Sequence, residues 1–376
     1  MSRFSAFDAT AMHRALELAA RGLETTHPNP RVGCVVAQGE RIVGEGFHAR
    51  AGEPHAEVFA LRAAGEAARG ATAYVTLEPC NHHGRTPPCV DALLAAGIAR
   101  VVYASHDLDP RVDGAGAARL RAAGITVEGG LLEAEADDLN AGFLSRLRRG
   151  RPWVRLKLAM SLDGRTALAS GESRWLTSEA ARADVHAWRA RSDAVLTGIG
   201  TVLADDPQLT VRRVQGVARQ PLRVVLDSRL RLPPDAKMLR EPGETLLLTT
   251  ASASSAPAGL RGGSAGPRIE TAVADPAGRV QLDAALRRLG ELGLNEVWVE
   301  AGATLSAALQ AAGLVDEWVL YVAPVLLGAD ARPLLDMPGA ARLANAPRLR
   351  VIDVQPVGAD VRIMLRSGGM GSPVEG

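Results

Sequence analysis

The sequence predicts two α/β domains in tandem. Strand-like apolar runs alternate with segments of helical periodicity along the whole chain, a pattern typical of mainly parallel sheets with crossover helices. The length of 376 residues allows two or three domains of ordinary size. The alternation is interrupted by a basic stretch, residues 145–152, and restarts at Trp153. We interpret this stretch as a solvated linker in preference to a nucleic-acid-binding patch, and we expect domains at 1–147 and 148–376.

The first half contains the elements of one three-layer unit, which ends near Gly142. Asp8 is a good N-cap for a helix that runs to Ala20, with Gly22 just beyond its last turn. The turn at 38–40 joins two strands, and from there helices and strands alternate. The expected elements after the first helix are strands 31–37 and 41–47, helix 55–68, strand 73–77, helix 90–96, strand 101–105, helix 115–123 and strand 125–128.

The second half repeats this alternation but shares no motif with the first. The segment 251–267 is rich in Ser, Ala and Gly, so we expect a surface excursion of low complexity there. We expect the tail after residue 367 to be disordered. The expected elements of this half are strand 154–160, helix 178–190, and strands 194–198, 223–227, 245–250, 296–300 and 318–324.

The composition excludes several classes of protein. The net charge of +1 is unlike that of a nucleic-acid-coating protein, and 3% aromatic residues are too few for stacking platforms along a single strand. No apolar run is long enough to span a membrane, and the N-terminus has no signal-peptide core. Three cysteines without a secretory signal indicate a reducing, cytoplasmic location. We therefore expect a small-molecule partner, with neither nucleic acid nor membrane.

Four residues supply the groups of a catalytic zinc site: His55, Glu57, Cys80 and Cys89. The order H-x-E, then P-C, then a second Cys is that of the zinc-dependent nucleobase deaminases. One imidazole and two thiolates give three protein ligands and leave a fourth position for water, whose pKa zinc lowers. Glu57 is the expected proton carrier to the departing amine. Cys34 lies in an apolar run, so we predict a reduced core residue there and not a ligand.

The spacing of the two thiols leaves alternatives open. Eight residues separate Cys80 from Cys89, whereas the usual signature is C-x-x-C, and this polar, turn-rich insertion predicts a loop that closes back on the metal. The same residues would also fit a surface histidine and two small buried cysteines. A tRNA-editing deaminase and a zinc-stabilised scaffold are further alternatives. A scaffold usually has a fourth protein ligand, for which His82 or His83 is the ready candidate.

A second candidate site lies where the strand 296–300 ends. Glu300 is followed by a glycine and by a helix that begins near Thr304, so backbone N–H groups at the helix start can hold a pyrophosphate. The segment is not G-x-G-x-x-G, and taken alone it fits a plain strand–turn–helix equally well.

Longer stretches of the chain resemble a known family. They are N-P-R-V-G-C-V-V, G-E-P-H-A-E-V, V-T-L-E-P-C-N-H-H-G-R-T-P-P-C and L-K-L-A-M-S-L-D-G-R-T-A-L-A-S-G-E-S-R-W-L-T-S. These stretches lie between Asn29 and Pro333. Their sequences and their order along the chain are similar to those of the bifunctional deaminase–reductases of bacterial riboflavin biosynthesis. The resemblance implies a cytidine-deaminase-like three-layer domain followed by a dihydrofolate-reductase-like domain. It also implies Zn²⁺ and NADPH as cofactors and a homo-oligomer.

The resemblance further implies two consecutive reactions. The first removes the pyrimidine 2-amino group of a diamino-phosphoribosylaminopyrimidine, which leaves the uracil form. The second transfers hydride from NADPH and opens the ribosyl unit to a ribityl chain, with the protein supplying position and charge.

Carried over position by position, the resemblance assigns His55, Cys80 and Cys89 to zinc and Glu57 to proton transfer. The positions implied to line the deaminase pocket are Asn29, His48, His82 and Arg85. Those implied to contact the nicotinamide cofactor are Ala159, Trp175, Thr201, Asp205, Ser228, Gly302, Ala303, Thr304, Leu305, Ser306, Ala307 and Ala308. Those implied to face the reductase substrate are Lys157, Ser173, Arg189, Leu209, Arg212 and Glu300. The two arginines suit a sugar phosphate, although Arg189 also fits a helix-dipole partner and Trp175 a core residue.

Overall fold

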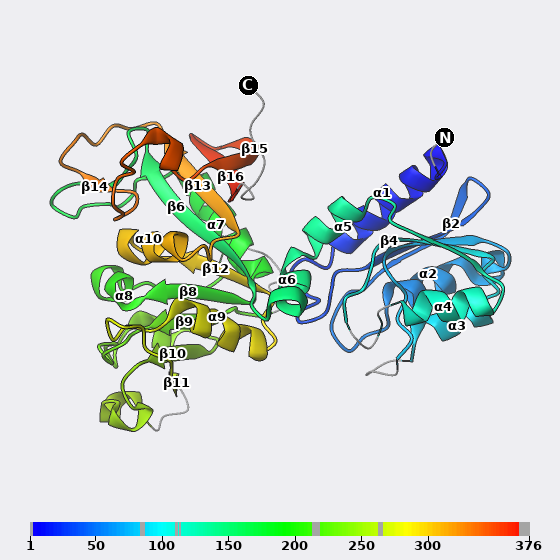
Figure 1. The fold of residues 1–376 in the computed structure, drawn as a ribbon, viewed down its shortest axis with the longest axis horizontal. Helices are drawn as coiled ribbons and strands as arrows, with labels where there is room; N and C mark the ends of the chain where they lie inside the picture. Colours follow the sequence, from blue (N-terminus) through cyan, green and yellow to red (C-terminus); the bar gives the residue numbers. More distant parts are fainter. Residues whose placement is uncertain are drawn as a thin grey trace. The chain divides into compact units, whose positions relative to one another are not determined.

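The computed structural model describes residues 3–82, 87–109, 112, 114–212, 219–261 and 266–367. The chain folds as two compact units, Met1–Gly150 and Arg151–Gly376, each built around its own sheet (Figure 1). The predicted α/β class is confirmed in both. The tail after residue 367, predicted to be disordered, lies outside the described residues. Within the described ranges, no helix combines the length and apolarity needed to cross a membrane.

The first unit has a five-stranded sheet of mixed direction. Its strands are β1 (Gly33–Gln38), β2 (Arg41–Phe47), β3 (Thr72–Leu77), β4 (Arg100–Ser105) and β5 (Thr126–Gly129), in the order β2-β1-β3-β4-β5. Strand β1 is antiparallel to both of its neighbours, whereas β3, β4 and β5 are parallel. The carboxyl ends of β3 and β4 therefore lie side by side, because Leu77 pairs with Ser105.

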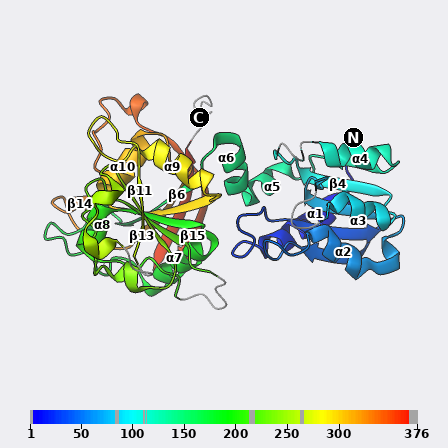
Figure 2. The ribbon, with the colours of Figure 1, turned by 90° about the horizontal axis from the view of Figure 1, so that it is seen from below.

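Helices cover both faces of this sheet. The helices are α1 (Ala6–Ala20), α2 (Ala56–Ala64), α3 (Cys89–Ala95), α4 (Ala115–Ala122), α5 (Glu133–Leu139) and α6 (Ala141–Arg149). Cys34 and Val36 pack with residues of α2, α3 and α4, on the face that Figure 2 shows. Val35 and Ala37 point the other way and pack against α1 and α5, as the two-residue period of a strand requires. The prediction that Cys34 is a core residue is confirmed.

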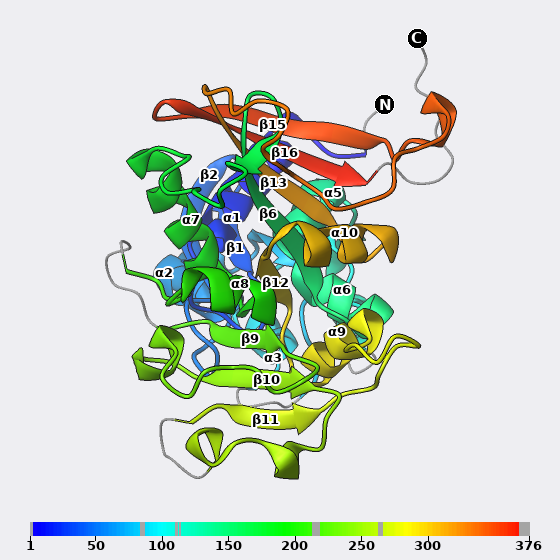
Figure 3. The same cartoon turned by 90° about the vertical axis from the view of Figure 1, so that its left-hand side faces the viewer.

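The second unit has a nine-stranded sheet in the order β11-β10-β9-β8-β12-β6-β13-β16-β15 (Figure 3). From β11 to β13 all neighbours are parallel, and the last two strands are antiparallel. The bounds are β6 (Trp153–Ser161), β8 (Ala194–Gly198), β9 (Leu222–Leu226), β10 (Thr245–Thr249), β11 (Arg268–Thr271), β12 (Glu296–Glu300), β13 (Glu317–Ala323), β15 (Leu349–Val357) and β16 (Asp360–Ser367). A separate pair joins β7 (Arg165–Ala167) and β14 (Arg332–Pro333).

Two pairs of helices cover the two faces of this sheet. Helices α9 (Leu282–Glu291) and α10 (Ala303–Ala311) pack on one face through Leu286, Leu289 and Leu309. Helices α7 (Glu179–Arg191) and α8 (Ile199–Asp205) pack on the other. There the rings of Trp188 and Trp298 are stacked with their centroids 5.4 Å apart. The predicted mainly parallel sheet with crossover helices is confirmed for this unit.

The predicted linker at 145–152 is wrong for its first five residues, which form the end of helix α6. The expected domain boundary after residue 147 falls inside this helix. Phe143 and Leu144 are buried, and Gly150 ends the helix in the left-handed conformation at φ 67°. Arg148 is exposed and Arg146 and Arg149 are half-buried, so a basic stretch that resembles a linker is part of an amphipathic helix.

Candidate functional site

The metal-ligand candidates come from three elements of the first unit. His55 is the N-cap of α2, Cys80 follows β3, and Cys89 is the first residue of α3. His55 Nδ1 lies 2.8 Å from Cys89 Sγ and 3.5 Å from Cys80 Sγ, and the two sulfur atoms are 3.4 Å apart. The three ligand atoms all lie within 4.8 Å of one another. The structure thus brings together the three residues that the sequence predicted to bind zinc.

This cluster fits a zinc ion. Tetrahedral zinc with ordinary bond lengths places its sulfur and nitrogen ligands about 3.5 to 3.8 Å apart, close to both separations measured from Cys80, whereas the 2.8 Å between His55 Nδ1 and Cys89 Sγ must widen when the ion binds. Hydrogen bonding from the Cys89 thiol lowers the pKa of Cys80, which favours the thiolate that a metal requires. Among the described residues the cluster contains three protein ligands, and His82 is not one of them. Such a set leaves a coordination position free for water.

Glu57 is a buried carboxylate next to this cluster. It is the second residue of α2, is 3% exposed, and lines the same cavity as the three ligands. Its Oε2 has no hydrogen-bond partner among the described residues. Burial raises the pKa of Glu57, and the nearby Cys80 sulfur raises it further. A carboxylate with a free oxygen and a raised pKa is suited to proton transfer at neutral pH.

A cavity of about 420 Å³ opens above the cluster and contains three of the predicted pocket residues, Asn29, His48 and His82. Asn29 Nδ2 lies 3.0 Å from His48 Nε2, and the rings of His48 and His55 meet edge to face at 5.5 Å. The fourth predicted pocket residue, Arg85, lies outside the described residues. The remaining lining residues are Pro28, Pro30, Val32, Leu77, Glu78, Asp107, Asp109, Phe143, Arg146 and Leu147.

Sequence reasoning missed two acidic residues at the carboxyl ends of parallel strands. Asp107 follows β4 as Cys80 follows β3; it is 6% exposed, and burial raises its pKa to about 6. Glu78 accepts hydrogen bonds from the backbone N–H groups of Gly114 and Ala117, at 3.3 and 3.4 Å. Ligands bind at this edge of parallel sheets, so polar residues that directly follow a predicted strand are the signal that would have found both.

Three of the predicted reductase substrate residues gather in the second unit. Lys157 on β6 and Glu300 on β12 are register partners on neighbouring parallel strands. Arg189 of α7 forms a bidentate pair with Glu300, at 2.6 and 2.9 Å. Burial alone would raise the pKa of Glu300, but Arg189 lowers it to about 2. Burial lowers the pKa of Lys157, so its charge is less stable than that of an exposed lysine.

Two more of these residues lie on the segment after α8. Arg189 Nη1 donates to the Thr210 carbonyl at 2.9 Å, and Arg212 Nη1 donates to Thr210 Oγ1 at 3.4 Å. Leu209 precedes Thr210 and adopts a left-handed conformation with φ 53°. The hydrogen bonds of Arg189 are made to β12 and to this segment, so a partnership with the helix dipole does not account for its position.

Most of the predicted cofactor residues lie at the carboxyl ends of β6, β9 and β12, at the start of α8 and in the first half of α10, whereas Asp205 ends α8 and Trp175 lies between β7 and α7. Gly302 caps α10, and its N–H donates to Thr201 Oγ1 at 3.2 Å. A Cβ at Gly302 would meet only this hydroxyl, 3.8 Å away, so a ligand can approach the backbone there. Ser228 Oγ accepts from Val280 N at 3.0 Å. These positions suit a dinucleotide with its pyrophosphate at the start of α10.

A second cavity, of about 480 Å³, contains Ser173 and Trp175. Its walls are Thr166, Leu168, residues 172–178, the end of β13 with the segment that follows it, and the start of β16. Trp175 is 71% exposed, so the alternative that it is a core residue is wrong. The Arg182 guanidinium lies 4.6 Å from its ring centroid. The structure therefore groups Ser173 and Trp175 in one cavity, whose described lining does not include Lys157, Arg189 or Glu300.

Comparisons with known sequences match both units. The cytidine and deoxycytidylate deaminase zinc-binding region matches residues 5–105, and the RibD C-terminal domain matches residues 152–363. The riboflavin biosynthesis protein RibD of Escherichia coli K12 is 52% identical over 370 residues, which cover 95% of this chain and 99% of that protein. RibD of Haemophilus influenzae is 46% identical over 98% of this chain and 100% of that protein.

Solved structures agree with these matches. RibD of Acinetobacter baumannii superposes with a TM-score of 0.88 at 47% identity, over 96% of this chain and 99% of that one. A diaminohydroxyphosphoribosylaminopyrimidine deaminase/5-amino-6-(5-phosphoribosylamino)uracil reductase of Thermotoga maritima superposes with a TM-score of 0.84 at 34% identity, also over 96% of this chain and 99% of that one. The likeness therefore extends through both units.

Proposed function

The chain belongs to the RibD family of riboflavin biosynthesis proteins, and from this membership we propose that it catalyses two consecutive reactions. It deaminates a diamino-phosphoribosylaminopyrimidine to the uracil form and then reduces the ribosyl unit to ribityl with NADPH. We assign deamination to the first unit, residues 1–150, and reduction to the second, residues 151–376. The observation that carries the proposal is the gathering of His55, Cys80 and Cys89 in one cavity with the buried Glu57.

In the deaminase unit, this chain's residues bind the substrate and move a proton. A zinc ion held by the three ligands supplies an activated water at neutral pH. Glu57 accepts a proton from the attacking water at its unpartnered Oε2 while the water oxygen bonds to the amino-bearing carbon. Glu57 then delivers the proton to the amine nitrogen, the C–N bond breaks, and the nitrogen leaves as ammonia. Because burial raises the pKa of Glu57, the carboxyl group can hold this proton between the two transfers. The residues proposed to bind the substrate are Asn29, His48, His82 and Arg85.

In the reductase unit, the residues position the cofactor and grip the substrate. Reduced nicotinamide supplies the hydride. Glu300 holds the Arg189 guanidinium in a fixed plane, which suits it to a sugar hydroxyl or phosphate. The other residues proposed to face the substrate are Lys157, Ser173, Leu209 and Arg212. Those proposed to contact NADPH are Ala159, Trp175, Thr201, Asp205, Ser228 and residues 302–308.

A coupled assay tests the two-step proposal. Purified protein receives the diaminopyrimidine ribotide and NADPH, and ammonia release and NADPH loss are followed separately. We expect both signals, with NADPH loss lagging behind ammonia release. Ammonia without NADPH oxidation would contradict the reductase assignment, and neither signal from zinc-loaded, folded protein would contradict the whole proposal.

We also propose that the protein is a homo-oligomer in the cytoplasm. The oligomer follows from the family resemblance, and light scattering on purified protein tests it. The location follows from the chemistry of the site, because Cys80 and Cys89 bind zinc as thiolates, and both are free cysteines in the structure. Fractionation of cells that express the tagged chain tests the location.

A further inference from the structure

Helix α6 forms one wall of the deaminase cavity, although it lies outside every sequence motif that resembles the family. Phe143, Arg146 and Leu147 line the cavity, and their spacing of three and four residues places them on one face of the helix. Phe143 is 8% exposed, and the Arg146 guanidinium lies 5.7 Å from the centroid of its ring. The face of α6 toward the cavity is therefore an ordered wall with one cation on it.

The start of α6 is fixed to the segment that carries Asn29. Asn140, which precedes the helix and is 1% exposed, accepts a hydrogen bond from Arg31 N at 2.8 Å. Its amide nitrogen donates to the carbonyl of Arg31 at 2.9 Å. Asn29 and Pro30 of the same segment line the cavity. These two hydrogen bonds fix the start of α6, and with it Arg146, relative to the cavity wall that Asn29 and Pro30 form.

The charge of the cavity makes Arg146 distinctive. Among the described lining residues, the acidic ones are Glu57, Glu78, Asp107 and Asp109, and Arg146 is the sole lysine or arginine. A substrate with a phosphate group brings about two further negative charges at neutral pH. Carboxylates repel a phosphate, so a permanent cation on the described wall is suited to hold that group, beside Arg85, which is proposed for the same pocket and lies outside the described residues.

The depth of the residues indicates which end of the substrate Arg146 meets. Glu57 is 3% exposed and Cys89 is 1% exposed, so the reacting pyrimidine carbon must lie deep in the cavity. Arg146 is only half-buried, and its long stem lets the guanidinium stay at the rim. The phosphate is the end of the ribotide farthest from the pyrimidine, so it lies toward the rim.

We propose that Arg146 binds the 5-phosphate of the deaminase substrate and thereby selects ribotides over ribosides. The inference rests on the proposed function, because it concerns the substrate of the same zinc site. The guanidinium forms paired charge-assisted hydrogen bonds with the phosphate oxygens. It touches no reacting atom, so it contributes to binding and not to the chemical step.

The test compares wild type with Arg146→Gln in steady-state deamination of the ribotide and of the matching riboside. We expect the Michaelis constant for the ribotide to rise about 10- to 100-fold, with kcat changed by less than about twofold, since charge-assisted bonds contribute about this much. For the riboside, kcat/KM should be the same in both proteins. Arg146→Lys should recover part of the lost affinity for the ribotide, because it keeps the charge and loses the fork.

Arg148→Gln is the matched control. Arg148 lies on the same helix, does not line the cavity, and is paired with Asp137 at 3.6 Å. Its replacement should leave both substrates unaffected. An unchanged kcat/KM for the riboside shows that the first unit is folded in each variant, and normal NADPH-dependent reduction of the deaminated ribotide shows the same for the second unit. An unchanged Michaelis constant in Arg146→Gln would overturn the inference, and so would an equal loss for ribotide and riboside. Absence of deamination in the wild type would instead contradict the proposed function itself.

Discussion

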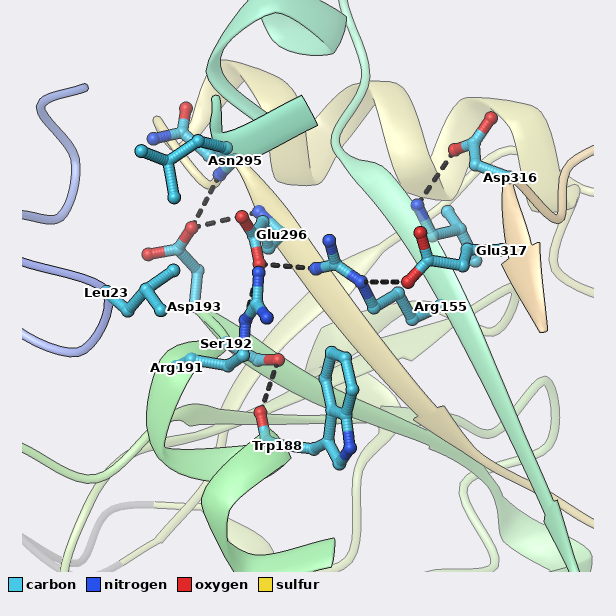
Figure 4. Close-up of polar contacts among 12 residues, drawn as sticks. Leu23, Arg155, Trp188, Arg191, Ser192, Asp193, Asn295, Glu296, Asp316 and Glu317 are labelled. Atoms are coloured by element: carbon cyan, nitrogen blue, oxygen red, sulfur yellow. Dashed lines mark hydrogen bonds and ion pairs between the residues drawn. The ribbon is translucent and has the colours of Figure 1, made fainter. Parts of the chain in front are cut away.

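Replacing Arg155 with methionine should destabilise the second unit by about 3 to 5 kcal/mol, the usual cost of removing one partner from a buried ion pair. Arg155 bridges two carboxylates, with Nη1 2.5 Å from Glu296 and Nε 2.7 Å from Glu317 (Figure 4). The three side chains are 4%, 1% and 2% exposed. After the replacement both carboxylates stay buried with one guanidinium fewer. Arg366 still lies 3.2 Å from Glu317, whereas Arg191 is 3.7 Å from Glu296, so Glu296 loses more.

The assay is urea unfolding followed by tryptophan fluorescence. The five tryptophans all lie between Trp153 and Trp318, so the signal reports on the second unit alone. The control is Arg287→Met, because Arg287 and Asp283 form a pair of similar length, 2.8 Å, on the surface of α9, with side chains 56% and 43% exposed. We expect the control to cost no more than about 0.5 kcal/mol.

Arg155→Met and Arg287→Met differ in the burial of the ion pair that they remove. Similar losses in the free energy of unfolding would therefore refute the reasoning. A second substitution tests the effect of the uncompensated charge on Glu296. In the Arg155→Met background, Glu296→Gln should restore part of the lost stability, because a buried neutral amide costs less than an uncompensated carboxylate. A further loss in the double variant would show that lost packing, and not charge, dominates.

Three further predictions address catalysis and pH. Glu57→Gln should lower deamination by about 100- to 10,000-fold and leave NADPH-dependent reduction of the deaminated ribotide intact; normal ammonia release would show that Glu57 is not the proton carrier. Arg212→Ala should raise the reductase Michaelis constant about tenfold or more with little change in kcat, through loss of charge-assisted bonds; an unchanged constant would contradict substrate binding by Arg212. Burial lowers the pKa of His186 to about 4, below the ordinary value of about 6.5. The unfolded chain therefore binds a proton at His186 at a higher pH than the folded chain does. The contribution of neutral His186 to the free energy of unfolding is complete above pH 6.5. It is lost as the pH falls toward 4, by about 3 kcal/mol at most. Urea unfolding of His186→Gln between pH 7 and 4.5 should show a shallower decline than wild type, and equal slopes would refute this.

The candidate zinc ligands were predictable because each belongs to a short motif whose residue types are those of a metal site. Asp107 and Arg146 have no such motif: they line the cavity because β4 is the parallel neighbour of β3 and because Asn140 fixes α6 against the Asn29 segment. The same limit applies to β15 and β16. Their many exposed positions give little apolar signal, and only pairing with β13 makes them part of the sheet.

The sequence by itself determined the α/β alternation and identified the candidate ligands His55, Cys80 and Cys89 and the candidate proton carrier Glu57, because strand and helix periodicities and metal-ligand chemistry are local properties. Only the tertiary structure decided the sheet order that places β12 between β8 and β6, with Lys157 opposite Glu300 and Arg189 across from both. Strand order and register depend on pairing between segments far apart in the chain, and this pairing cannot be predicted from the sequence of any one segment.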